Sequence, residues 1–92
     1  MSKRMMSYYQ ILSAFKEKVE RPYIQGYKCK VPSCRKLILV KKKGVGWGMA
    51  ASGALSMHLL HAHTDIPAIR IASEMGAFEK REVELPKFLE AA

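Results

Sequence analysis

The chain has little cysteine, little acidic charge before its C-terminal third and no long, strongly apolar run. Its two cysteines are too few for the disulfide framework that stabilises small secreted domains. A secretory signal peptide is also not expected, because Gln10, Ser13 and Lys16 interrupt the stretch that follows the basic N-terminus. We therefore expect an intracellular, reducing compartment, in which the cysteines are free thiols or metal ligands.

A membrane-spanning helix is not expected either. One stretch of 21 residues, 44–64, carries no charged side chain, but it contains four glycines, two serines and three histidines. This composition is poor for a transmembrane helix, which depends on strongly apolar residues. The sequence therefore predicts a protein without a membrane partner.

The sequence also lacks the combinations of residues that catalysis requires. Glu17 and Glu20 are the only acidic residues before residue 65, so paired catalytic carboxylates are not evident there. The glycines at 44, 46 and 48 lack the strand-to-helix setting and the spacing of a phosphate-binding loop. A thiol nucleophile paired with a histidine would need a polar group to orient the histidine, and none is evident. We therefore predict a binding protein rather than an enzyme.

Basic charge is concentrated in the first two thirds of the chain. The whole sequence has 16 Lys and Arg against 8 Asp and Glu, a net charge of +8. Residues 1–63 hold 12 basic and 2 acidic side chains (+10), whereas residues 64–92 hold 4 basic and 6 acidic ones (−2). A polyanion would therefore bind the first part. We expect the tail to serve in packing or as a surface for a partner.

Hydrophobic periodicity predicts three helices, over residues 7–20, 52–63 and 67–78. The first is expected to begin at Ser7 as N-cap, with an apolar stripe of Tyr8, Ile11, Leu12, Phe15 and Val19. The third should have Pro67 in its first turn and a buried face of Ile69, Ala72 and Met75.

Between the first two helices, strand-type residues over 23–43 predict a hairpin with a turn at 31–33. A flexible basic loop is expected to follow, from residue 41 through the glycines at 44, 46 and 48. The order helix, hairpin, helix, helix predicts a small α+β domain.

All cysteines and histidines of the chain lie within one window of 35 residues, 29–63. Cys29 and Cys34 are placed on the hairpin, and three histidines follow on the second helix: His58, His61 and His63. Zinc prefers four such ligands in a tetrahedron, and short chains commonly supply two from a turn and two from a helix. His58 and His61 share a helix face, whereas His58 and His63 are about 140° apart on an ideal helix, so the last turn would have to loosen.

These residues resemble the BED-type zinc finger. The resemblance covers residues 7–63 and rests on Tyr27-Lys28-Cys29, Cys34-Arg35-Lys36 and Ser52-x2-Leu55-x2-His58-Leu59-x3-His63. It differs in having four residues between the cysteines, where the family usually has two. The resemblance implies zinc bound by Cys29, Cys34, His58 and His63. It also implies DNA binding in transcriptional or chromatin regulation, in the nucleus if the organism is eukaryotic.

The expected architecture is a small zinc-stapled ββα finger on which an N-terminal and a C-terminal helix pack. Residues 1–66 would form the finger with its N-terminal helix. Residues 67–92 would form a C-terminal helix and tail packed on the same domain.

Nucleic acid is expected to bind the hairpin and the loop after it, because clustered cations suit backbone phosphates. The predicted contact residues are Lys28, Lys30, Arg35, Lys36, Lys41, Lys42, Lys43, Trp47, Ser52 and Ser56. Trp47 is the expected exposed aromatic residue, whereas Tyr23 and Tyr27 are expected to pack in the core. DNA is the expected partner, and RNA remains an alternative.

The second helix offers little for reading bases. Ala51, Gly53, Ala54 and Met57 occupy its reading positions, and none of them can form a side-chain hydrogen bond with a base edge. This apolar face gives an alternative hypothesis, that the finger is an adaptor that docks a protein through Trp47, the second helix and the tail helix.

Overall fold

Within residues 3–41 and 47–89, which the computed structural model describes (for 47–49 the backbone alone), the chain forms two antiparallel sheets and three α-helices. The elements in chain order are β1 (Arg4–Ser7), α1 (Tyr8–Ala14), β2 (Lys16–Glu20), β3 (Ile24–Cys29), β4 (Leu37–Lys41), α2 (Trp47–Ala62), α3 (Pro67–Glu74), β5 (Lys80–Val83) and the short 3-10 turn η1 (Lys87–Leu89). This is the small α+β architecture that the sequence predicts, and it is compatible with a ββα finger.

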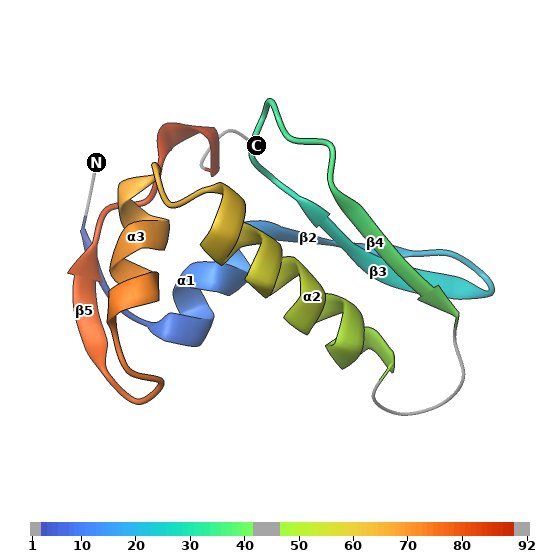
Figure 1. The fold of residues 1–92 in the computed structure, drawn as a ribbon, viewed down its shortest axis with the longest axis horizontal. Helices are drawn as coiled ribbons and strands as arrows, with labels where there is room; N and C mark the ends of the chain where they lie inside the picture. Colours follow the sequence, from blue (N-terminus) through green and yellow to red (C-terminus); the bar gives the residue numbers. More distant parts are fainter. Residues whose placement is uncertain (1–2, 42–46, 90–92) are drawn as a thin grey trace.

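The elements fall into two groups along the long axis of the molecule (Figure 1). At one end, α2 lies across one face of a three-stranded sheet with the order β2-β3-β4, in contact with β3 and β4. At the other end, α1 and α3 pack against each other beside a ribbon made of β1 and β5.

The first predicted helix is half as long as its apolar stripe suggests. Ser7 is the N-cap, as predicted, and it forms a capping box with Gln10. However, α1 ends at Ala14, and residues 16–20 form strand β2. The prediction of a helix to residue 20 was wrong, because the pairing of β2 with β3 outweighs the helical preference of its lysines and glutamates.

The hairpin prediction is confirmed by β3 and β4, which pair antiparallel from Ile24 opposite Lys41 to Lys28 opposite Leu37. Gly26 sits in the middle of this sheet, where a Cβ atom would lie 1.8 Å from the carbonyl oxygen of Ile38. Only glycine fits at this close approach.

The second helix begins at Trp47, five residues before the predicted start at Ser52, and ends at Ala62, close to the predicted end. The third begins at Pro67, as predicted, and ends at Glu74 rather than at residue 78. Its predicted apolar face is buried, with Ile69, Ala72 and Met75 in the core. None of the helices in the described ranges is both long and apolar enough to cross a membrane.

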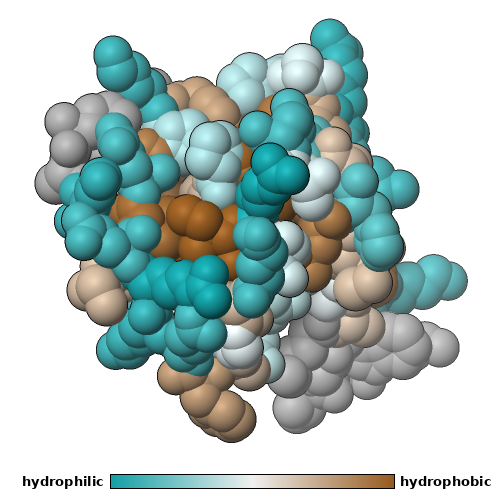
Figure 2. All heavy atoms as spheres, turned by 60° about the vertical axis from the view of Figure 1, so that its left-hand side comes forward, coloured by the Kyte–Doolittle hydropathy of each residue, from teal (hydrophilic) through white to brown (hydrophobic). Residues whose placement is uncertain are grey.

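The tail completes the same core that the first 66 residues build. Strand β5 pairs with β1, so residues 80–83 hold the N-terminal segment in place. Phe88 packs edge-on against the buried Phe15, with ring centroids 6.1 Å apart. Figure 2, in which this end of the molecule comes forward, shows apolar side chains in the middle of a largely hydrophilic face.

Because one apolar core joins all three helices, a cavity in α3 should weaken the whole domain. Ile69 is fully buried, so Ile69→Ala should lower the free energy of unfolding by about 2–5 kcal/mol. Urea unfolding followed by circular dichroism should show one transition at a lower midpoint. Glu74→Ala, at an exposed position of the same helix, should change stability by less than about 0.5 kcal/mol. Two separate transitions would contradict the packing of residues 67–92 on the same domain.

Candidate metal centre

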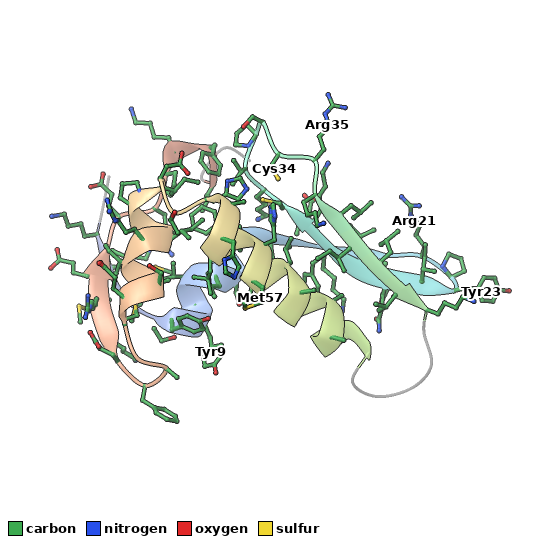
Figure 3. All side chains as sticks on the ribbon, in the orientation of Figure 1. Tyr9, Arg21, Tyr23, Cys34, Arg35 and Met57 are labelled. Carbon is green, nitrogen blue, oxygen red and sulfur yellow. The ribbon has the colours of Figure 1, made fainter. Side chains whose placement is uncertain are left out.

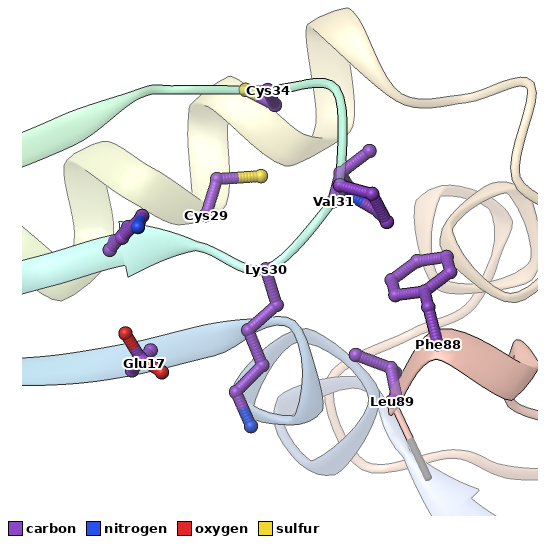
Figure 4. Close-up of a pocket in the computed structure, with 9 residues that line it drawn as sticks. Glu17, Cys29, Lys30, Val31, Cys34, Phe88 and Leu89 are labelled. Atoms are coloured by element: carbon purple, nitrogen blue, oxygen red, sulfur yellow. The ribbon is translucent and has the colours of Figure 1, made fainter. Parts of the chain in front are cut away.

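The turn between β3 and β4 presents the two thiols. Cys29 is the last residue of β3, and Cys34 follows the turn at residues 31–33, which is closed by a hydrogen bond of 2.9 Å from the Cys34 N–H to the Val31 carbonyl. The Cys29 N–H donates to the Lys36 carbonyl at 3.0 Å, so the two arms of the turn remain joined beyond the regular ladder. The four residues between the cysteines therefore form a wide turn whose two ends lie close together (Figure 4).

The end of α2 presents the two imidazoles. His58 lies four residues before the helix ends at Ala62, and His63 follows directly after that end. The His63 N–H still donates to the Leu59 carbonyl at 3.1 Å, so the chain leaves the helix only after one further backbone bond. This exit brings the two rings together, with centroids 4.9 Å apart and planes at 84°.

Three separations among the four donor atoms are close to those in a tetrahedral zinc site. With Zn–S bonds of about 2.3 Å and Zn–N bonds of about 2.0–2.1 Å, a tetrahedron places sulfur and nitrogen about 3.6 Å apart and two nitrogens about 3.3 Å apart. The Nε2 atom of His63 lies 3.6 Å from the Cys29 sulfur, and the Nε2 atom of His58 lies 3.2 Å from the Cys34 sulfur. The two Nε2 atoms are 3.2 Å apart, and all four donor atoms lie within 4.8 Å of one another.

The structure thus brings Cys29, Cys34, His58 and His63 into one group that is positioned to bind a metal ion. Two sulfur and two nitrogen donors form a ligand set that is consistent with zinc. His61, the alternative fourth ligand, is exposed and lines a shallow groove with Ile38 and Met57 instead. The binding of a zinc ion by these four residues is a prediction.

Burial shifts the pKa of two of the four candidate ligands. It raises the pKa of the Cys29 thiol from 9.0 to about 11, and the neighbouring Cys34 adds to this effect. Burial lowers the pKa of His58, helped by the nearby His63 and Lys36. Without a cation, both shifts favour the neutral forms, a thiol at Cys29 and a neutral imidazole at His58. A bound zinc ion would favour the thiolates.

The C-terminal turn lies beside the cysteine hairpin. Phe88 and Leu89 line a cavity of about 330 Å³ together with Cys29, Val31 and Lys30 (Figure 4). The Lys30 side chain points away from the two sulfur atoms in this view. The tail thus shields one side of the candidate metal centre with apolar side chains.

The predicted phosphate contacts on the hairpin lie on more than one face. Lys28 and Arg35 are exposed and line the same hollow, whereas Lys36 lies on the α2 side, next to His58. Lys30 lines the neighbouring cavity, and Lys41 is exposed at the far end of β4. Lys42 and Lys43 lie outside the described residues.

The three residues of α2 that were predicted to contact nucleic acid differ from expectation in their structural environment. Trp47 is the first residue of the helix rather than part of a loop, and its side chain is outside the description. The Ser52 hydroxyl accepts a hydrogen bond of 2.9 Å from the Lys16 ammonium group. The Ser56 hydroxyl donates to the Ser52 carbonyl at 3.1 Å. Both hydroxyls are therefore engaged within the fold.

Two features of the surface were not predicted from the sequence. Tyr23 was expected in the core, yet its side chain is 85% exposed at the tip of the β2–β3 hairpin. Arg21 was not predicted as a contact residue, although it lines the same hollow as Lys28 and Arg35. If residues 16–20 are assigned to a strand, Arg21-Pro22 becomes the tip of a hairpin. That assignment would have predicted both the exposure of Tyr23 and the surface position of Arg21.

Comparison of the chain with protein-family models, with curated proteins and with solved structures finds no match. We therefore infer a function from the chemistry of the described surface and of the Cys2His2 group.

One zinc ion per chain should bind, and its removal should unfold the β3–β4 hairpin and α2. Structural zinc contributes on the order of 10 kcal/mol of apparent binding energy in small fingers, much of which is folding energy. His63→Ala should abolish stoichiometric zinc in elemental analysis, whereas His61→Ala should leave it unchanged. A protein that loses zinc with His61→Ala and keeps it with His63→Ala would reverse the assignment of the fourth ligand.

Proposed function

We propose that this chain is a zinc-stabilised nucleic-acid-binding module that contacts DNA mainly through backbone phosphates, in transcriptional or chromatin regulation. The observation that carries the proposal is the group of exposed cations beside the Cys2His2 cluster. Lys28 directly precedes one candidate ligand and Arg35 directly follows another, and both line one hollow with Arg21. A metal-fixed turn would hold these charges in place, as phosphate recognition requires.

The charge distribution supports an anionic partner for this half of the molecule. Residues 1–63 carry a net charge of +10, and Lys28, Lys30, Arg35, Lys36 and Lys41 are all exposed in the structure. The acidic residues of the tail lie mainly on α3, β5 and the segments around them. The resemblance to BED-type fingers supports DNA as this partner, and it favours a nuclear location in a eukaryote.

The exposed face of α2 supports contacts with the DNA backbone rather than with bases. Gly53, Ala54 and Met57 are its exposed residues in the described middle of the helix, and none of them has a side-chain hydrogen-bond donor for a base edge. Ser52 and Ser56 are engaged with Lys16 and with the helix itself. We therefore expect similar affinities for different duplex sequences.

The same face of α2 favours a second candidate function, that of a protein-binding adaptor. The Met57 side chain is 53% exposed, and with Ile38 and Ala54 it lines a groove of about 430 Å³ between α2 and β4. Exposed apolar side chains beside a groove are typical of protein contacts. Retained DNA binding by Met57→Glu would separate this face from the DNA-binding one.

The DNA-binding proposal is tested by a salt titration of binding to a blunt DNA duplex. Each phosphate contact contributes about −0.9 to the slope of log K against log salt. Replacing Lys28 and Arg35 together by glutamine should weaken binding to all duplexes alike and reduce the magnitude of the slope by up to about 2. Fluorescence anisotropy at several salt concentrations gives both quantities.

Lys80→Gln is the matched control, because Lys80 is an exposed lysine on β5, in the other sheet. It should leave the slope unchanged. Zinc content must be the same in all variants, since Lys28 and Arg35 are neighbours of the cysteines in the sequence. Absence of duplex binding by the wild type at low salt would contradict the proposal and favour the adaptor function.

A further inference from the structure

One face of the β2–β3–β4 sheet is left open by the helices. Cys29 faces α2, where its sulfur approaches His63. Since side chains alternate along a strand, Lys28 points to the opposite face. The strand register adds the neighbours of Lys28 to this face, which we call the open face: Glu17 and Val19 on β2, Ile24 and Gly26 on β3, and Leu37, Leu39 and Lys41 on β4.

The open face holds the largest of the hollows described for this structure, with a volume of about 600 Å³. Three cations line it, Arg21, Lys28 and Arg35, against a single carboxylate, Glu17. Its floor is aliphatic, with the half-buried Val19 and the 43% exposed Leu37. The hollow therefore suits an anionic ligand that also has apolar surface.

An exposed aromatic ring projects beyond the end of the three-stranded sheet. Residues 21–23 form the tip of the β2–β3 hairpin, which is closed by a hydrogen bond of 2.9 Å from the Arg21 N–H to the Ile24 carbonyl. Pro22 restricts the backbone of the tip, and the Tyr23 side chain is 85% exposed. Figure 3 shows Tyr23 projecting beyond the end of the sheet, while Arg21 and Arg35 point to the same side of it.

Cations and ring are spaced along the strand direction. Lys28 lies five positions after Tyr23 in the chain, which corresponds to about 17 Å of extended strand. This length accommodates several linked anionic groups rather than one isolated phosphate. An extended polyanion could follow the cations from the metal turn to the tip.

We propose that the open face binds an unpaired nucleic-acid strand, with phosphates on Arg35, Lys28 and Arg21 and one base stacked on Tyr23. This inference rests on the proposed function and names the form of nucleic acid that the open face takes. Stacking on an aromatic ring needs a base face, which a duplex keeps covered and an unpaired strand exposes. An acidic peptide would satisfy the cations but would leave the exposed ring at the tip without a role.

The test compares three labelled DNA probes by fluorescence anisotropy: a blunt duplex, the same duplex with a single-stranded thymidine overhang, and oligothymidine alone. The wild type should bind the overhang probe more tightly than the blunt duplex. Tyr23→Ala should weaken binding to the overhang and to oligothymidine by roughly 5- to 100-fold, which is the effect of losing one stacked base. Its affinity for the blunt duplex and its salt slope should not change. Tyr23→Phe should retain wild-type affinity.

Phe78→Ala is the matched control, because Phe78 is a fully exposed aromatic residue outside the three-stranded sheet. It should bind all three probes like the wild type. Glu17→Gln should strengthen binding to the overhang probe, since Glu17 is the one carboxylate that lines the hollow in the described part of the chain.

Three results would overturn the inference, and they can be told apart. Unchanged overhang binding by Tyr23→Ala, with normal binding to the blunt duplex, refutes the inference and leaves the proposed function intact. Loss of wild-type binding to all three probes at low salt refutes both. Displacement of the overhang probe by polyglutamate, equally in the wild type and in Tyr23→Ala, would identify the open face as a site for acidic protein segments.

Discussion

The β3–β4 turn and the end of α2 meet through four side chains that can share one metal ion. A hairpin of this size is barely stable by itself in water, and α2 contributes few fully buried side chains, among them Leu55 and Leu59. A zinc ion shared by the two thiols and the two imidazoles would join these elements with far more energy than either has alone. The orientation of α2 on the sheet, and hence the chemistry of every exposed face nearby, depends on this junction.

The junction divides the surface into two regions of different chemistry. His58 faces the hairpin, and the groove beside it between α2 and β4 is lined by Ala54 and Met57. Because Cys29 faces α2, its strand neighbour Lys28 is directed to the open face. Cations thus line one side of the sheet, and the groove with Ala54 and Met57 lies on the α2 side. Two partners of different chemistry could bind without competing for the same residues.

The C-terminal third contributes to the site by closing the core rather than by carrying ligands. Strand β5 holds the N-terminal strand, and α3 buries Ile69 between the helices. Phe88 packs on Phe15 and lines the cavity beside Cys29. Removal of this segment would expose the apolar side of α1 and one side of the cysteine turn. We therefore expect the metal centre to depend on the tail even though the tail supplies no donor atom.

The sequence by itself determined the local features whose causes lie within a few residues: the N-cap at Ser7, the turn at 31–33 and the start of α3 at Pro67. The tertiary structure decided the rest. Residues 16–20 fit a helix by periodicity, but pairing with β3 makes them a strand, and this pairing exposes Tyr23 at the new hairpin tip. His63 could be chosen over His61 only once α2 ended at Ala62, because donor geometry depends on where the helix stops. Strand pairing and ligand convergence join residues far apart in sequence, and their energies exceed the small local preferences that a sequence displays.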